Sequence, residues 1–302
     1  MIYPRVSVGI VAIAWLSSFL IPIAILGLVC TGDMVSLAVL CLCLFFGSIA
    51  PIGGHPIIRD FFLNGISDAV GGTVILHTER PNPNERVLYA IHPHGLTSTL
   101  TGLALGDINK RTDQRVALVV APLLRWLNPL MRLLMGFLGV DLLSSDKHQV
   151  QSYMRKGHRV GIVVGGFEEM LRTRSDKEIL YLKKRRGFLK QAIKNGYAVV
   201  PVYCFGESQI YRNRIELSNE MRDVCAKWKI PAAIPTGSRG VSFMPHKPEG
   251  GTLIVFGEPQ RWTTDEIATP ESFNRVHDEY IQGLVRLYNR HNPYKSRQLE
   301  IV

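Results

Sequence analysis

The chain begins with two long apolar runs, and shorter apolar runs alternate with polar segments through the rest of its 302 residues. Two ranges near the N-terminus, 7–30 and 34–50, contain no charged residue. As helices they would be roughly 36 and 26 Å long, against about 30 Å for the hydrocarbon core of a bilayer. We therefore predict a membrane hairpin over residues 1–52, whose shorter second arm allows either a transmembrane or a re-entrant path.

After the hairpin, runs of strand length that are rich in Val and Ile alternate with segments of helical length. Continuous apolar runs of this kind are typical of strands covered on both faces. Strands are expected at 73–76, 87–91, 116–120, 160–164, 198–203 and 252–256. Helices are expected at 96–105, 123–138, 147–156, 186–195 and 270–291. This order predicts an α/β domain over residues 53–302 with a largely parallel sheet, and the loop-rich stretch 229–251 is expected to cover its site.

The formal net charge of +10 comes entirely from the globular part, because Arg5 and Asp33 cancel within the first 50 residues. The connector of the hairpin has no Lys or Arg, whereas Arg5 and the basic domain flank the two arms. Positive flanks favour the cytosolic side, so both ends of the hairpin and the domain are expected to face the cytosol. No nucleic-acid partner is expected, because aromatic residues are not interleaved with the basic ones.

Polar or glycine-rich segments follow three of the predicted strands. They are His92-Pro93-His94-Gly95, Gly165-Gly166-Phe167-Glu168-Glu169 and Phe205-Gly206-Glu207. In parallel α/β sheets ligands bind at the carboxyl ends of the strands, so these segments are expected to meet in one site. Two histidines separated by one residue of extended backbone point the same way, which makes the first segment the main candidate for chemistry.

A neutral histidine can take a proton from an alcohol near pH 7, because its unperturbed pKa is about 6.5. We assign this general-base role to His94, with His92 as the alternative. A carboxylate, Glu168 or Glu169, would orient the ring and stabilise the imidazolium. The Gly-x-Ser-x-Gly pattern is absent from the sequence, which favours direct attack by a bound hydroxyl over a covalent acyl-enzyme. Candidate donors to the oxyanion are the backbone N–H groups of Gly95, Gly165 and Gly166.

A basic segment, 183–186, follows the second strand end. On a helix that begins near Arg186, Lys190 lies on the same exposed face as Arg186. Such a cluster beside a histidine and carboxylate site can hold the phosphates of an acyl carrier or rest on anionic lipid headgroups. The nine histidines show no metal-ligand spacing beyond His-Pro-His, so no metal or redox cofactor is expected.

Together these motifs resemble the type-2 diacylglycerol acyltransferase family, which includes monoacylglycerol and wax-alcohol acyltransferases. The segments that carry the resemblance are Tyr89 with His92-Pro93-His94-Gly95, Gly165-Gly166-Phe167-Glu168-Glu169, Arg186-Gly187-Phe188, Phe205-Gly206-Glu207 and Arg239-Gly240. The hairpin also fits, so the resemblance spans most of the chain.

The resemblance implies transfer of a fatty acyl group from acyl-CoA to the hydroxyl of a neutral lipid, foremost diacylglycerol, at the endoplasmic reticulum membrane or the lipid droplet. It makes Glu169 the carboxylate of the site. The residues then expected to bind acyl-CoA are Lys183, Lys184, Arg186, Lys190 and Arg239. Those that support the motifs are Pro93, Gly187, Phe188, Phe205, Gly206 and Glu207. The chain departs from related glycerolipid acyltransferases, which have Asp five positions after the histidine, because Thr97 and Thr99 stand there.

Monoacylglycerol and a fatty alcohol are the alternative acceptors. A lipid hydrolase and a non-enzymatic hairpin protein of lipid droplets are the alternatives from other classes. The missing nucleophile motif weighs against the hydrolase, and the intact His-Pro-His-Gly segment with Glu169 weighs against the non-enzymatic protein. A homo-oligomer is left open.

Overall fold

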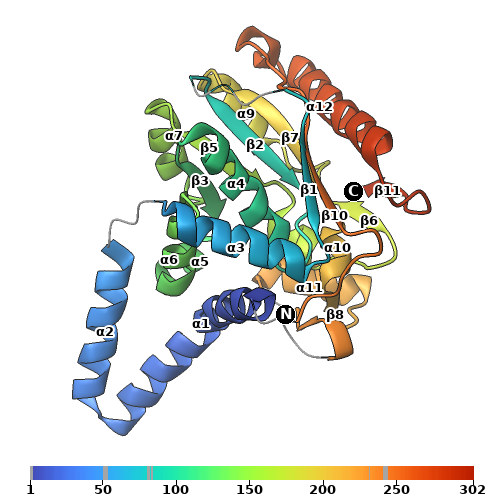
Figure 1. The fold of residues 1–302 in the computed structure, drawn as a ribbon. Helices are drawn as coiled ribbons and strands as arrows, with labels where there is room; N and C mark the ends of the chain where they lie inside the picture. The colour runs from blue at the N-terminus through green and yellow to red at the C-terminus, as the bar shows by residue number, and fades with distance from the viewer. Residues whose placement is uncertain (1–2, 50–53, 80–81, 83, 231, 241–243) are drawn as a thin grey trace.

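A seven-stranded sheet, in the order β1-β10-β7-β2-β5-β3-β4, forms the centre of the molecule (Figure 1). The computed structural model describes residues 3–49, 54–79, 82, 84–230, 232–240 and 244–302. All neighbouring strands of the sheet run parallel except β10 and β7, which are antiparallel. The predicted α/β domain with a largely parallel sheet is confirmed.

Six strands of this sheet lie where the apolar runs predict them, with ends that differ by two residues or fewer. They are β1 Thr73–His77, β2 Val87–His92, β3 Val116–Val120, β5 Arg159–Val163, β7 Ala198–Phe205 and β10 Thr252–Phe256. The edge strand β4 (Val140–Ser144) was not predicted. Its residues alternate between buried and half-buried, as on a strand with one covered face, so it lacks the continuous apolar run of the others.

Helices connect and cover the strands. They are α3 Pro56–Ala69, α4 Thr99–Thr112, α5 Pro122–Leu127, α6 Pro129–Phe137, α7 Lys147–Arg155, α8 Gly166–Met170, α9 Gly187–Lys194, α10 Glu207–Ile210, α11 Asn219–Trp228 and α12 Pro270–His291. The 3-10 helices are Ser238–Gly240 and Asp265–Ile267. The prediction of α12 is confirmed, whereas α3, α8, α10 and α11 were not predicted. The helix predicted at 96–105 is displaced towards the C-terminus, because α4 begins only after the loop that carries His94.

The single helix predicted at 123–138 is wrong, since α5 and α6 are separate helices that meet at Asn128. A residue before proline is disfavoured in helical conformation, and Asn128 precedes Pro129. The Asn128 side chain then caps the second helix, because its Oδ1 accepts a hydrogen bond from the Met131 N–H at 2.8 Å. The break allows α5 and α6 to follow the edge of the sheet beside β4.

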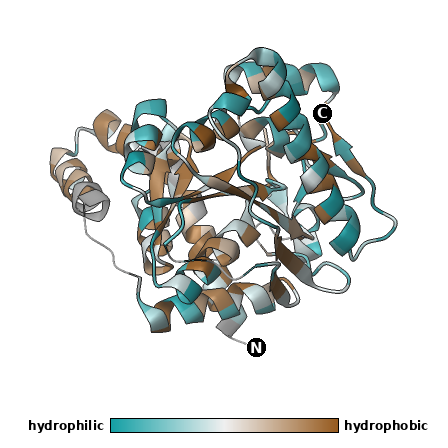
Figure 2. Cartoon of the chain, turned by 90° about the horizontal axis from the view of Figure 1, so that it is seen from above, coloured by the Kyte–Doolittle hydropathy of each residue, from teal (hydrophilic) through white to brown (hydrophobic). Residues whose placement is uncertain are grey.

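Two hydrophobic clusters lie on the two faces of the sheet. Residues of α3, α4 and α6 form one cluster, and residues of α7, α9 and α12 form the other. Along β2 the side chains alternate between them, with Tyr89 and Ile91 in the first and Leu88 and Ala90 in the second. Figure 2 shows the apolar strands enclosed between helices with polar outer faces. A strand covered on both faces is buried at every position, which is why its sequence reads as a continuous apolar run.

The N-terminal residues form two helices, α1 (Tyr3–Thr31) and α2 (Met34–Ile49), joined at Gly32-Asp33 (Figure 1). The first half of α1 packs on the domain, because Ala14 is buried in the core cluster and its carbonyl accepts a hydrogen bond from Asn128 Nδ2 at 2.8 Å. Among the described residues, no helix combines the length and the apolar character needed to cross a bilayer, so a membrane-spanning hairpin is not confirmed. The predicted boundary at residues 52 and 53 lies outside the described residues.

Two small sheets complete the fold. The C-terminal strand β11 (Leu299–Ile301) pairs in parallel with β6 (Glu178–Leu180), and β8 (Arg212–Asn213) pairs with β9 (Pro235–Thr236). The loop-rich stretch 229–251 contains β9 and one 3-10 helix, although residues 231 and 241–243 of it lie outside the described part.

A buried arginine at the first residue of β5, Arg159, joins β2, the segment just before β3 and the loop before β2. Arg159 is 2% exposed; its Nε donates to Gln114 Oε1 at 2.8 Å and its Nη1 to the Tyr89 hydroxyl at 2.7 Å. Nη2 donates to the Asn82 carbonyl. Three neutral acceptors from different segments thus depend on one guanidinium.

We expect Arg159→Ala to lower the free energy of unfolding by about 2–4 kcal/mol, because it leaves buried acceptors without a donor and opens a cavity. Thermal or denaturant unfolding of the purified chain measures this loss. Arg155→Ala, at an exposed position of α7, is the control and should change stability by less than about 0.5 kcal/mol. Equal losses in the two variants would contradict the assignment.

Candidate functional site

The carboxyl ends of β7, β2 and β5 meet at one edge of the sheet, because these strands are direct neighbours. The segment 92–95 begins at the last residue of β2, α8 begins just after β5, and α10 begins just after β7. The predicted gathering of the three motif segments is confirmed. A hydrogen bond from the His94 N–H to Glu169 joins the first segment to the second, and Glu207 of the third segment packs against Gly95 of the first.

The His94 side chain is partly exposed, and a contact with the main chain fixes the orientation of its ring. Its Nδ1 lies 2.8 Å from the Gly95 carbonyl oxygen. Because a carbonyl oxygen only accepts, the proton is assigned to Nδ1, and the lone pair is left on Nε2. Burial lowers the pKa of His94 below its usual value, although the bond to Gly95 raises it, so the ring is neutral at pH 7. This is the state that a general base requires.

His92, in contrast, is packed in the core. It is fully buried, and its Nε2 lies 2.9 Å from the Tyr280 hydroxyl of α12. Burial lowers the pKa of His92 to about 3, so this ring is also neutral. No hydrogen-bond partner is found for its Nδ1 among the residues that the structure describes. The geometry therefore separates the two histidines into one at the surface of the site and one inside the core.

Glu169 contacts the main chain of the His94 segment rather than the ring. Its Oε1 accepts from the His94 N–H at 2.6 Å and its Oε2 from the Tyr181 N–H at 2.7 Å. The side chain is 1% exposed, and burial raises the pKa of Glu169 to about 7. A Cβ at Gly165 would lie 2.0 Å from Glu169 Oε2, so glycine is required there. The ring is oriented by Gly95, and the orienting role expected of a carboxylate is not what Glu169 performs here.

Glu168 faces two cations. It pairs with Lys229 Nζ at 2.8 Å and with the Arg185 guanidinium, whose Nη2 also lies 3.3 Å from the Gly165 carbonyl. Burial alone would raise the pKa of Glu168, and Lys229 and Arg185 together lower it below the usual value. Glu168 is thus an ionised partner of these cations, and Lys229 ties the start of the 229–251 stretch to α8.

Glu207 holds the first turn of α4. Its Oε1 accepts from the Thr99 N–H at 3.0 Å and its Oε2 from the Leu100 N–H at 2.7 Å. These are helix-terminal N–H groups that have no partner within the helix. Gly95 has φ +61°, and a Cβ there would lie 2.6 Å from Glu207 Cγ, so the third motif segment packs directly on the first. Burial raises the pKa of Glu207 to about 7.

The remaining motif residues support the core beside the site. Phe188 of α9 packs edge-on against Tyr280 with ring centroids 5.1 Å apart, and Phe205 packs against Tyr288. Gly187 begins α9, and Gly206, at φ +93°, precedes α10.

The basic residues expected to bind acyl-CoA lie at the surface. Lys183, Lys184, Lys190 and Arg239 are exposed, and Arg186 donates to the Asn274 side chain of α12. Within the described part of the chain none of them contacts His94 or Glu169. Sequence reasoning missed Arg185, Lys229, Tyr181 and Tyr280. Arg185 stood in the basic run itself, but nothing in the pattern distinguished it from its neighbours.

Comparison with known proteins shows which family the chain belongs to. The diacylglycerol acyltransferase family profile matches residues 73–300, from β1 to β11, and includes every strand of the site. The chain belongs to the diacylglycerol acyltransferase family. This membership identifies it as an O-acyltransferase, and the helices α1 to α3 lie before the matched part.

Three similar proteins are named as acyltransferases. The chain is 27% identical over 228 residues to diacylglycerol O-acyltransferase 2 of Dictyostelium discoideum, covering 70% of this chain and 67% of that protein. It is 31% identical over 229 residues to diacylglycerol O-acyltransferase 1 of Schizosaccharomyces pombe, covering 71% and 65%. It is 27% identical over 250 residues to acyl-CoA wax alcohol acyltransferase 1 of Mus musculus, covering 78% and 72%. The aligned part is thus about two thirds of the first two relatives.

The C-terminus of this acyltransferase is connected to the site through β6. Glu178 of β6 is buried, its Oε1 pairs with Arg297 at 2.7 Å, and its Oε2 accepts from the Ser208 hydroxyl at 2.6 Å. Tyr181, which directly follows β6, donates the N–H that holds Glu169. The position of Glu169 therefore depends on strand pairing with the last residues of the chain.

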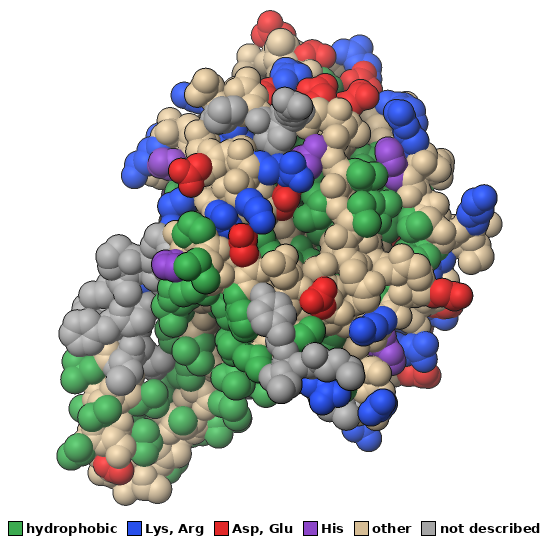
Figure 3. Space-filling view, viewed as in Figure 1, with side chains coloured by type: hydrophobic (Ala, Val, Ile, Leu, Met, Phe, Trp, Pro, Cys, Tyr) green, Lys and Arg blue, Asp and Glu red, His purple; other side chains and the backbone are tan. Residues whose placement is uncertain are grey.

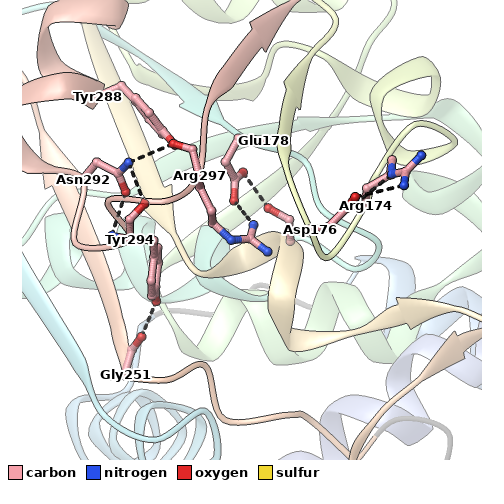
Figure 4. Close-up of polar contacts among 9 residues, drawn as sticks. Arg174, Asp176, Glu178, Gly251, Tyr288, Asn292, Tyr294 and Arg297 are labelled. Atoms are coloured by element: carbon pink, nitrogen blue, oxygen red, sulfur yellow. Dashed lines mark hydrogen bonds and ion pairs between the residues drawn. The ribbon is translucent and has the colours of Figure 1, made fainter.

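Figure 4 shows how the turn before Arg297 is fixed. The Tyr288 hydroxyl donates to the Arg297 carbonyl at 3.0 Å, and Asn292 Nδ2 donates to the Tyr294 carbonyl at 3.1 Å. The Tyr294 hydroxyl donates to the Gly251 carbonyl at 2.6 Å. The hydrogen bonds of this turn therefore hold the Arg297 guanidinium beside Glu178.

We expect Arg297→Met to lower stability by about 3–5 kcal/mol, because Glu178 is left buried without its cation. If the pair positions the site through β6, kcat falls more than KM rises, and Glu178→Leu with Arg297→Met recovers part of both losses. Thermal unfolding and steady-state kinetics on the same samples separate the effects. Unchanged kcat in the folded fraction of Arg297→Met would contradict the positioning role.

We expect kcat/KM to fall as the pH falls through about 7. Glu169 then binds a proton, and its protonated oxygen no longer accepts one of the two N–H bonds. His94 is not the cause of this fall in kcat/KM, because its pKa is lowered below the usual value for histidine. A pH–rate profile measures this fall, which Glu169→Gln should make smaller while it lowers the rate at every pH, and Glu207, whose pKa is also raised to about 7, accounts for the part that remains. Glu249→Gln, at an exposed position, should keep the wild-type profile, and a flat wild-type profile from about pH 6 to about pH 8 would contradict the assignment.

Proposed function

We propose that this acyltransferase moves a fatty acyl group from acyl-CoA to the hydroxyl of diacylglycerol, giving triacylglycerol. The observation that carries the proposal is the state of His94, whose Nδ1 proton is engaged by the Gly95 carbonyl while Nε2 keeps its lone pair. A neutral imidazole in this tautomer accepts the proton of an alcohol.

In the proposed reaction, His94 Nε2 takes the proton of the acceptor hydroxyl as the oxygen attacks the thioester carbonyl. The tetrahedral intermediate collapses with cleavage of the C–S bond, and the imidazolium returns the proton to the coenzyme A thiolate. Backbone N–H groups of Gly95, Gly165 and Gly166 are the proposed donors to the oxyanion. Glu169 acts indirectly, since it fixes the main chain from which the His94 ring extends.

Acyl-CoA carries several phosphate charges, so basic residues are its expected contacts. Lys183, Lys184 and Arg186 flank Arg185, which pairs with Glu168 of the α8 segment. The Arg185–Glu168 pair supports a position of the basic run next to α8, and the side chains of Lys183, Lys184 and Arg186 are exposed. We propose these three residues, with Lys190 and Arg239, for the coenzyme A moiety, and no cofactor is part of the proposal.

A fatty alcohol is the second candidate acceptor. The match to the relative named as a wax alcohol acyltransferase covers 78% of this chain, a larger share than the matches to the two relatives named as diacylglycerol acyltransferases above. The chemistry at His94 is the same for both acceptors, because each offers a single hydroxyl.

A membrane location is proposed from exposed apolar side chains, which Figure 3 shows gathered over α1 and α2. Those more than half exposed on these helices include Ile13, Leu20, Ile23, Leu26, Val35 and Leu42. Large exposed apolar patches mark interaction sites with proteins or membranes. On this reading the hairpin rests in a bilayer, at the endoplasmic reticulum or lipid droplet, with the domain on the cytosolic side.

A second exposed apolar set lies beside the site. Met221, Val224 and Trp228 share one face of α11, and each is more than half exposed. Lys229, the next residue, pairs with Glu168. A lipid surface against α11 would bring a membrane-dissolved acceptor to the edge of the sheet where His94 lies.

We expect His94→Ala to lower the rate of acyl transfer by about 10²–10⁴, the usual value of general-base catalysis. Labelled oleoyl-CoA is offered to membranes that contain the protein, with diacylglycerol, monoacylglycerol, fatty alcohol or no acceptor. His148→Ala, at an exposed position of α7, is the matched control and should keep the wild-type rate.

Label in one ester class that is lost in His94→Ala supports the proposal and names the acceptor. Label that appears only as free fatty acid would make the protein a hydrolase. A His94→Ala rate above roughly a tenth of wild type would contradict the general-base role.

A further inference from the structure

The long helix α12 packs against one face of the sheet and brings a buried hydroxyl to the site. Val276 and Leu284 of this helix are 0% exposed and lie in the core cluster that also contains residues of α7 and α9. Tyr280 lies between them, is fully buried too, and packs edge-on against Phe188 with ring centroids 5.1 Å apart. The position of the Tyr280 hydroxyl is therefore set by the packing of the core and not by a loop.

This hydroxyl makes the one side-chain hydrogen bond of the His92 ring that is found among the described residues. Its oxygen lies 2.9 Å from His92 Nε2, and Nδ1 of the same ring has no partner in the described part of the chain. Burial raises the pKa of Tyr280 well above its usual value, so the hydroxyl keeps its proton.

The direction of this hydrogen bond follows from the groups that it leaves unpaired. If Tyr280 donates to Nε2, only the Nδ1–H of His92 is unpaired among the described residues. The reverse bond would leave both the hydroxyl proton and the Nδ1 lone pair unpaired, and each unpaired buried group costs free energy. We therefore assign the hydroxyl as the donor and place the ring proton on Nδ1.

The sheet itself holds the main chain only as far as His92. This residue is the last of β2 in the register with β7, where it lies opposite Tyr203. Pro93 follows and has no N–H to donate. The segment that carries His94 is therefore held by contacts outside the strand ladder.

On the far side of Pro93, both main-chain groups of His94 are held. Glu169 accepts from the His94 N–H at 2.6 Å, and the Ser98 hydroxyl donates to the His94 carbonyl at 2.9 Å. On the near side, the hydrogen bond from Tyr280 to the His92 ring is the corresponding contact. The segment is thus fixed from two directions, by α8 and by α12.

We propose that Tyr280 is a positioning residue of the acyl-transfer reaction, which holds the His92 ring and thereby sets the place of His94 Nε2 relative to the acceptor hydroxyl. The inference rests on the proposed function, because it takes His94 as the general base. Tyr280 makes no contact with substrate in this account and transfers no proton. A displacement of about 1 Å at a reacting group can lower a rate about 10²-fold, so loss of the hydrogen bond acts on the chemical step.

The test compares Tyr280→Phe with Tyr197→Phe in the purified full chain, assayed with oleoyl-CoA and the acceptor that the wild-type chain esterifies. Tyr280→Phe keeps the ring and removes only the hydroxyl. Tyr197 is the matched control, because it is buried and its hydroxyl donates to the Met154 and His158 carbonyls at 2.8 and 2.7 Å. It directly precedes β7, whereas the site lies at the other end of that strand.

We expect kcat to fall about 10–10²-fold in Tyr280→Phe, with little change in KM for acyl-CoA, and to stay within about twofold of wild type in Tyr197→Phe. Each variant loses one buried hydroxyl, so both should lower the thermal unfolding midpoint by roughly 2–4 °C. A chain with para-aminophenylalanine in place of Tyr280 keeps an N–H donor at the end of the ring and should recover most of kcat.

A second readout needs no activity. In the NMR spectrum of the chain with isotope-labelled histidines, Tyr280→Phe should shift the ring signals of His92 and the backbone N–H signal of His94, and Tyr197→Phe should leave both in place. Failure of the proposed function shows as an active His94→Ala variant. Failure of this inference shows as an unchanged His94 signal in Tyr280→Phe, so the two are distinguished.

Three kinetic results would overturn the positioning role of Tyr280. They are a kcat of folded Tyr280→Phe within about twofold of wild type, an equal fall of kcat in Tyr197→Phe, and no recovery of kcat with para-aminophenylalanine.

Discussion

The bridge that Glu169 makes between two backbone N–H groups is the interaction on which the rest of the site depends. At 2.6 Å from the His94 N–H and 2.7 Å from the Tyr181 N–H, this carboxylate joins the end of β2 to the end of β6. Neither strand is a neighbour of the other in a sheet, so no ladder of hydrogen bonds could fix their separation. The close approach of Glu169 also dictates a glycine at position 165, because a Cβ there would overlap the carboxylate.

Burial of three glutamates near one another makes the site an electrostatically coupled unit. Glu169 and Glu207 each accept two backbone N–H bonds, whereas Glu178 relies on Arg297 and the Ser208 hydroxyl. After burial, the charge of Glu178 is a further cause that raises the pKa of both Glu169 and Glu207. A change at the C-terminal segment that altered the ionisation of Glu178 would therefore shift the proton equilibrium of the carboxylate that holds His94.

The central strands could be predicted from the sequence, because strands covered on both faces are continuous apolar runs. The meeting of their carboxyl ends could also be predicted, because the carboxyl ends of parallel strands lie at one edge of the sheet. Prediction from the sequence failed for β4, whose residues alternate, and for β6 and β11, which are too short to carry a period. Within the site, position was predictable but contact was not. Tyr280 reaches His92 from 188 residues away, and of the basic run it is Arg185 that pairs with Glu168, whereas Arg186 donates to Asn274 of α12. Such contacts depend on the packing of α12 and α9, which no local pattern encodes.

A sequence motif therefore predicts where a site lies, but it does not assign a chemical role to each of its residues. Glu169, Glu207 and Gly95 all belong to motif segments, yet their contacts are with main chain or with each other, and what they fix is the loop between β2 and α4. Loss of activity on substitution of any of them would be expected from displacement of that loop alone, and would not by itself indicate proton transfer. His94 differs, because its Nδ1 is engaged and its Nε2 is the atom left to meet a substrate. A role in proton transfer has to be argued from that atom, and the roles of the others from the geometry they impose on it.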